Sequence, residues 1–254
     1  MARLVRRRRR RASARCALLS RAYARGLAHA RAQLATTLAF IHARGVAHRD
    51  LSPENVVLTC RATLPPAAGR LKLIDFGLSG AMASDGMLPA RPPAGKAFYT
   101  APELLRGAVH SGAPADMWAL GTVLFVMLTG TPAWAVASRA DPDFERVTAR
   151  GELRLVLAER GVMDCPRQLL DLLAALLQPD PARRPTAAEV AAACAGGAGG
   201  GELVRLGASK ALSPSVSPLA PPISPAAAGG GGWRDGGGAA GVEDVDVGAL
   251  RLAA

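Results

Sequence analysis

The chain has 254 residues, half of them apolar, and a net charge of +11. This length supports one domain of ordinary size with tails. The charge is unevenly spread, because residues 1–49 carry thirteen Arg and no acidic residue, whereas the remainder has 18 basic against 20 acidic residues. The basicity therefore belongs to the N-terminus and not to the fold.

Residues 1–25 are rich in Arg, Ala and Ser. They fit a solvated, disordered leader, a nuclear-import signal, a contact with an anionic surface or nucleic acid, or an organelle transit peptide. No apolar signal-peptide stretch follows, which argues against secretion. The cysteines are scattered and predict reduced intracellular thiols, not a disulfide framework or metal site: Cys16, Cys60, Cys165 and Cys194. We expect a cytoplasmic or nuclear protein, with organelle import left open.

The first predicted helix has apolar residues on one face: Leu27, Leu34, Leu38 and Ile41. Gly45 provides its stop signal. The runs VVL at 56–58 and LKLI at 71–74 predict a β-hairpin with a long connection.

Residues 75–103 are rich in Gly, Pro and Ala, and a loop of that length is usually functional or disordered. Helical signals resume at 101–107, 116–129, 143–158, 166–177 and 185–195. The apolar run 116–130 is too short to span a bilayer and predicts a buried helix, so no transmembrane segment is expected. The Gly-, Pro- and Ser-rich residues 197–254 predict a disordered tail. The expected fold is mainly α with one small β-hairpin.

Five motifs occur in one order along the chain: HRDLSPEN at 48–55, LIDFGLS at 73–79, FYTAPE at 98–103, DMWALG at 116–121 and DPARRPT at 180–186. Together they resemble the C-terminal lobe (C-lobe) of a eukaryotic-type protein kinase. The resemblance covers about residues 26–196, and Pro53-Glu54-Asn55 is similar to the serine/threonine class. It implies transfer of the ATP γ-phosphate to hydroxyl groups of protein substrates.

The resemblance also implies roles for individual residues. Asp50 would accept or orient the proton of the attacking hydroxyl. Asn55 and Asp75 offer oxygen ligands suited to Mg²⁺, and Val57 would contact the adenine of ATP.

Other matching residues have structural or regulatory roles in the family. His48 would stack on Phe76, which precedes Gly77 in the D-F-G triplet. Arg49 resembles the loop Arg that receives an activation-segment phosphate. Asp116 resembles the buried carboxylate that holds the catalytic-loop backbone. Glu103 and Arg184 resemble the ion pair that clamps the activation segment to the lobe.

The chain departs from the family pattern at two positions. Ser52 stands where serine/threonine kinases usually carry a Lys that neutralises the transferring phosphate. Lys96 stands where the pattern commonly has Thr, on the facing segment. Either these are two independent losses, or Lys96 replaces the missing cation as a catalytic residue.

A complete kinase also has a β-rich N-lobe, which would make the fold α+β, and we expect this lobe to be missing. The three lysines are Lys72, Lys96 and Lys210, and none matches the N-lobe Lys. The chain is then an N-terminally truncated kinase, a C-lobe-only pseudokinase that binds or regulates, or one half of an enzyme completed by a partner. For the chain alone we expect neither appreciable ATP–Mg²⁺ binding nor activity.

The sequence also predicts sites for upstream kinases. Ser13 lies in RRRASAR, a pattern of basophilic kinases, and Ser84 lies in the activation segment. Ser213, Ser217 and Ser224 each precede Pro in the tail. A phosphate on Ser13 would partly neutralise the Arg block, and one on Ser84 would pair with Arg49.

Overall fold

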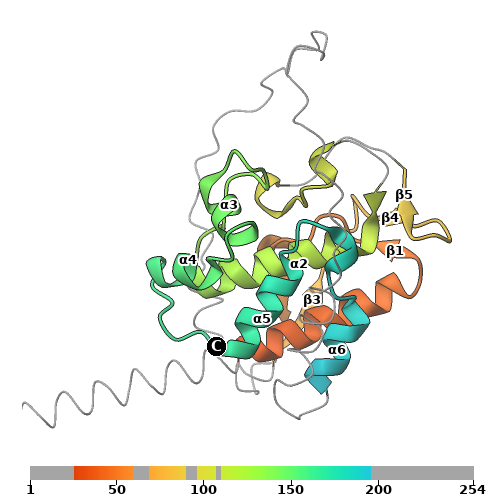
Figure 1. Cartoon of the computed structure of the whole chain (residues 1–254). Helices are drawn as coiled ribbons and strands as arrows, with labels where there is room; N and C mark the ends of the chain where they lie inside the picture. Colours follow the sequence, from red (N-terminus) through yellow and green to blue (C-terminus); the bar gives the residue numbers. More distant parts are fainter. Residues whose placement is uncertain (1–25, 60–68, 90–95, 107–109, 196–254) are drawn as a thin grey trace, which may run out of the picture.

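The computed structural model describes residues 26–59, 69–89, 96–106 and 110–195 (Figure 1). The predictions for residues 1–25 and for the tail, including Ser13, Ser213, Ser217 and Ser224, lie outside these ranges. The described part of the chain begins with a helix over residues 26–42. The helices that follow are α2 Gly112–Thr129, α3 Pro142–Thr148, α4 Leu153–Glu159, α5 Arg167–Leu176 and α6 Ala187–Ala195.

Helix α2 forms the centre of the core, and Figure 1 shows it running through the middle of the molecule. It is apolar on all sides, and Trp118, Leu124 and Phe125 are completely buried, as a helix surrounded by protein requires. A Cβ at Gly121 would lie 2.9 Å from atoms of Leu176 and Leu177, so only glycine permits this close approach to α5. The predicted central helix is thus present, and it begins four residues earlier than expected.

The same helix is the one described element with the length and apolarity to cross a membrane. However, 83% of it is buried inside the fold. Burial of this extent is what a core helix needs, and it accounts for the apolar run.

The first helix packs on this core as its sequence pattern predicts. Leu27, Leu34, Leu38 and Ile41 are all buried, and Gly45 follows with a φ of 71°. Gly45 has the left-handed backbone that ends helices readily, and the chain then enters the site.

The described strands form three antiparallel pairs, where the sequence predicted one hairpin. The predicted pair is β2 Val56–Thr59 with β3 Arg70–Leu73, in which Val57 lies opposite Lys72. Two further pairs join β1 Val46–Ala47 to β4 Gly80–Ala81 and β5 Met87–Leu88 to β6 His110–Ser111. These strands have two residues each, too short for a period-2 pattern to reveal.

Two predicted helices were wrong in detail. Residues 143–158 divide into α3 and α4, because Gly151 has a φ of 69° that interrupts a helix. Over the described residues 101–106 the structure has a short 3₁₀ helix, Leu104–Arg106, in place of the predicted helix. The predictions at 166–177 and 185–195 agree with α5 and α6 within two residues.

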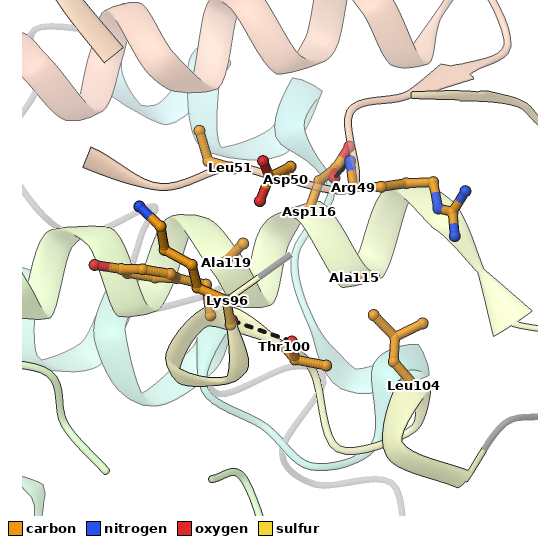
Figure 2. A pocket seen from close by; sticks show the side chains of 10 residues that line it. Arg49, Asp50, Leu51, Lys96, Thr100, Leu104, Ala115, Asp116 and Ala119 are labelled. Atoms are coloured by element: carbon orange, nitrogen blue, oxygen red, sulfur yellow. Dashed lines mark hydrogen bonds between the residues drawn. The ribbon is translucent and has the colours of Figure 1, made fainter. Parts of the chain in front are cut away.

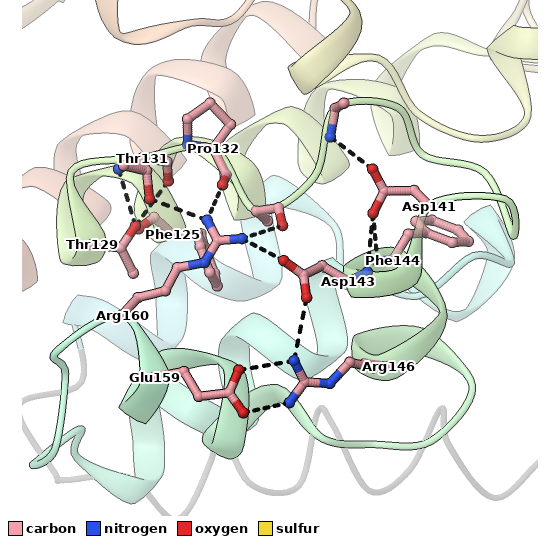
Figure 3. A network of polar contacts seen from close by, with 12 residues as sticks. Phe125, Thr129, Thr131, Pro132, Asp141, Asp143, Phe144, Arg146, Glu159 and Arg160 are labelled. Carbon is pink, nitrogen blue, oxygen red and sulfur yellow. Dashed lines mark hydrogen bonds and ion pairs between the residues drawn. The ribbon is translucent and has the colours of Figure 1, made fainter.

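A polar network ties α3 to α4 (Figure 3). The Arg160 guanidinium donates to Asp143 at 2.6 Å and to the carbonyls of Pro132 and Ala133. Arg146 donates to both carboxylate oxygens of Glu159, at 2.8 and 2.7 Å. These contacts fasten α3 to the end of α4.

Candidate active site

The catalytic loop, residues 48–55, is held by the Asp116 carboxylate from the start of α2. One oxygen accepts the His48 backbone N–H at 2.8 Å, and the other accepts the Arg49 backbone N–H at 2.8 Å. Arg49 has a φ of 69°, a conformation that costs energy for a residue with a side chain. A buried carboxylate with two charge-assisted bonds can maintain such a backbone. Asp116 thus occupies the position that the resemblance implied.

The His48 ring links the catalytic loop to the strand before Asp75. Its Nδ1 accepts the Asp50 backbone N–H at 3.3 Å. Nε2 therefore carries the proton, and it donates to the Ile74 carbonyl at 3.1 Å. The ring also meets Phe76 edge to face, with centroids 4.8 Å apart. The predicted His48–Phe76 stack is present in this form.

Asp50 and Asn55 contact each other directly. The Asn55 Nδ2 donates to the Asp50 backbone carbonyl at 2.7 Å and to its Oδ2 at 3.0 Å. Residues Pro53–Asn55 form a 3₁₀ turn that brings Asn55 back over Asp50. One oxygen of the Asp50 carboxylate is thereby oriented.

Asp75 is brought to the same place by the end of β3. The Ile74 backbone N–H donates to the Asn55 carbonyl at 2.9 Å. Asp75 itself has a φ of 61°, and its Oδ1 accepts the Gly77 backbone N–H at 3.1 Å. The sequence separated Asn55 and Asp75 by twenty residues, and this backbone contact joins their segments.

The donor set of Asn55 and Asp75 fits a hard divalent cation. Asn55 uses its nitrogen to hold Asp50, which leaves its carbonyl oxygen for a metal. Asp75 engages one oxygen with Gly77 and retains further acceptor capacity. The described residues hold no cluster of three or more His, Cys, Asp or Glu side chains suited to a metal. Two protein ligands are compatible with Mg²⁺, which keeps waters and binds substrate phosphates.

Ser52 is buried within the catalytic loop, at 1% exposure. Lys96 lies in the activation segment. The structure describes residues 69–89, which include the strand before this segment, and residues 96–106. Figure 2 shows the Lys96 side chain extending toward the catalytic loop near Asp50 and Leu51. There its Nζ lies 2.6 Å from the Glu54 Oε1. Lys96 and Asp50 also line one small pocket.

Glu54 and Tyr99 are site residues that the sequence analysis missed. Burial alone would raise the pKa of the Glu54 carboxyl, but the hydrogen bond and charge of Lys96, together with a backbone hydrogen bond, outweigh it and lower the pKa below its usual value. Burial and the Glu54 charge both raise the pKa of Tyr99. One signal in the sequence could have identified Glu54. It is an acidic residue two positions after Ser52, and no residue had been proposed to pair with it.

The predicted Glu103–Arg184 pair anchors the other end of the activation segment. The Arg184 Nη1 and Nη2 donate to the two Glu103 oxygens at 2.6 and 2.7 Å. The Arg184 side chain is fully buried, and it also donates to the carbonyls of Gln178 and Pro114. The Arg184 guanidinium also lies over the Trp118 ring, with its central carbon 4.9 Å from the ring centroid.

The structure shows where the remaining predicted residues lie, and their predicted roles stay predictions. Val57 is 40% exposed on β2. Ser84 is exposed in the turn between β4 and β5. The Arg49 Nη1 donates to the Leu78 carbonyl at 3.3 Å. Pairing of a phosphate on Ser84 with Arg49 stays a prediction.

Comparisons with known proteins agree with this geometry. The model of the protein kinase domain family matches residues 14–193. CBL-interacting protein kinase 30 of Oryza sativa subsp. japonica is 36% identical over 62% of this chain and 30% of its own length. CDPK-related kinase 5 of Arabidopsis thaliana is 36% identical over 62% of this chain and 24% of its own length. The chain thus spans less than a third of either relative.

The chain belongs to the protein kinase domain family. Members of this family in general use ATP and Mg²⁺ and act on protein substrates. This membership accounts for the Asp116 carboxylate, the Asp50–Asn55 contact and the Glu103–Arg184 pair as parts of one site.

Proposed function

We propose that this chain carries the catalytic loop of a protein serine/threonine kinase, which transfers the ATP γ-phosphate to hydroxyl groups of protein substrates. The observation that supports it best is the joined arrangement of Asp50, Asn55 and Asp75. A lone binding module has no need to hold a carboxylate against an amide and to set a second carboxylate beside them. We also propose an intracellular location, in the cytoplasm or nucleus.

The chain's own residues would divide the chemical tasks among them. Asp50 orients the substrate hydroxyl and accepts its proton through the carboxylate that Asn55 holds. Asn55 and Asp75 would hold Mg²⁺, which, when bound, neutralises phosphate charge. Lys96 would supply the cation that Ser52 cannot, since it reaches the catalytic loop from the facing segment.

Radiolabelled phosphate transfer from ATP to a generic protein substrate tests the proposal. The assay compares the 254-residue chain with the longest form that its transcript encodes, because an N-lobe with a phosphate-binding loop is expected to be required. Asp50→Asn should reduce transfer by at least about a hundredfold, as loss of a positioned base does. Asp171→Asn, which neutralises a carboxylate on α5 that pairs with the exposed Arg167, is the matched control. Transfer that survives Asp50→Asn would contradict the proposal.

A second candidate function is a catalytically inactive binding or regulatory module. Four large apolar side chains near the site favour it, because all are exposed: Val57, Ile74, Phe76 and Leu78. Exposed apolar side chains of this size are suited to being covered by another protein surface. The relative CBL-interacting protein kinase 30 is named for an interaction partner, which makes regulatory partners of this kind worth testing. Absence of transfer from every form of the chain would favour this function.

A further inference from the structure

The ion pair between Lys96 and Glu54 joins the activation segment to the catalytic loop. Its two charged atoms lie 2.6 Å apart, with 48% of the Lys96 side chain and 35% of the Glu54 side chain exposed. The two residues are far apart in the sequence and no motif links them. The pair sits beside the pocket that Asp50 and Lys96 share.

The backbone of Glu54 is held in place in the catalytic loop. It lies in the 3₁₀ turn Pro53–Asn55, where the Asn55 backbone N–H donates to the Ser52 carbonyl at 3.0 Å. The next residue, Asn55, is fastened to Asp50 by two hydrogen bonds. The backbone that carries Glu54 is therefore fixed relative to the catalytic carboxylate.

The backbone of Lys96 is also fixed, although its side chain is long. Its carbonyl accepts the Tyr99 backbone N–H at 3.0 Å and the Thr100 hydroxyl at 3.2 Å. The freedom that remains is in the side chain, and an exposed lysine keeps many rotamers unless a partner holds it. Glu54 is that partner in this structure.

Glu54 also competes with Asp50 for the ammonium. A lysine that paired with Asp50 would stabilise the charged form of that carboxylate and weaken it as a base. An ammonium has three donors, so Lys96 can remain bonded to Glu54 and still donate to a phosphate. Glu54 can thus keep the cation near the reaction without weakening the base.

We propose that Glu54 is a positioning residue, which holds the Lys96 ammonium at the entrance to the Asp50 pocket, where it receives the transferring phosphate. The pair replaces the single cation that the family carries at the position of Ser52. This inference rests on the proposed function, and it adds a requirement that the family pattern does not contain.

Nuclear magnetic resonance of the full chain tests the positioning directly. The chain has three lysines, so ¹³C-lysine labelling gives a small set of signals that Lys72→Arg and Lys210→Arg assign. Glu54→Gln should shift the Lys96 Cε signal, whereas Asp171→Asn should leave it in place. A Lys96 signal that ignores Glu54→Gln would overturn the inference.

Kinetics on the form that shows transfer supply the second measurement. Glu54→Gln should lower kcat by about tenfold with little change in KM for ATP, because misplacement of a charge acts on the transition state. Adding Ser52→Lys to Glu54→Gln should recover most of that loss, and a merely structural role would not be rescued in this way. Unchanged kcat in Glu54→Gln, or no rescue, would overturn the inference while leaving the proposed function intact.

The two measurements separate the two proposals. If no form transfers phosphate but the Lys96 signal responds to Glu54→Gln, the proposed function fails and the positioning of Lys96 by Glu54 stands. If the signal does not respond to Glu54→Gln, the positioning role fails whatever the activity.

Discussion

The activation segment is tied to the domain by two ion pairs that have the same chemistry and opposite environments. Arg184 is fully buried against Glu103, whereas Lys96 and Glu54 are both substantially exposed. A buried pair leaves an uncompensated charge when it is broken, while water and counterions replace most of an exposed one. The segment is therefore anchored permanently at its C-terminal end and held adjustably next to the catalytic loop.

Breaking the buried pair should produce the largest effect on stability. Arg184→Met leaves the Glu103 carboxylate without its partner and removes donors to the carbonyls of Gln178 and Pro114. We expect the free energy of unfolding to fall by about 3–5 kcal/mol, measured by urea denaturation. Arg167→Met, at an exposed pair on α5, is the control and should change little. Equal losses in the two variants would refute the distinction.

Weakening the Asp116 carboxylate should have the next largest effect. Asp116→Asn preserves the shape but turns one acceptor into a donor, so one of the His48 and Arg49 backbone N–H groups loses its partner. The expected cost is about 1–3 kcal/mol. Hydrogen exchange should show the two amides less protected than in the wild type. Unchanged protection at both would mean that other contacts hold the loop.

Lys96→Met should change stability least, although it lies nearest to the chemistry. An exposed pair is worth less than about 1 kcal/mol, so the denaturation midpoint should move only slightly. Turnover, measured on the form that shows transfer, should still fall by at least about tenfold if the cation acts on the phosphate. A large loss of stability with normal turnover would reverse the roles of the two pairs.

The smallest effect concerns pH. Because Lys96 helps to lower the pKa of Glu54, the pair stabilises the fold above the usual glutamate pKa of about 4.3 and loses this contribution as the pH falls through the lowered value. In Lys96→Met, the pKa of Glu54 should rise from its lowered value, because the hydrogen bond and the charge of Lys96 are gone. Carbon-13 titration of the Glu54 carboxyl measures the change. A Glu54 pKa that does not rise in Lys96→Met would show that other groups control it.

The two pairs also differ in how far the sequence could predict them. Glu103 and Arg184 lie inside motifs whose spacing identifies the family, so their pairing could be inferred across eighty-one residues. Lys96 was noticed because it departs from the family pattern, but its partner Glu54 was not, since pairing of two exposed side chains depends on how the segments fold. Helix α2 was predictable from its apolar run. The break at Gly151 was not, because its effect depends on a backbone angle and not on hydrophobic pattern.

Within the described residues, two that are not glycine have a left-handed backbone, Arg49 and Asp75, and both belong to the site. Each residue would lower its free energy by returning to an ordinary backbone conformation. The surrounding hydrogen bonds must therefore hold it in the strained one. His48 touches both segments, through the Asp50 amide and the Ile74 carbonyl. Release of the catalytic loop therefore weakens the hydrogen bond of His48 that restrains the segment of Asp75, and the reverse also holds. The two segments should therefore open together, in a switch between one closed and one open state. Gradual loosening of the site is not expected.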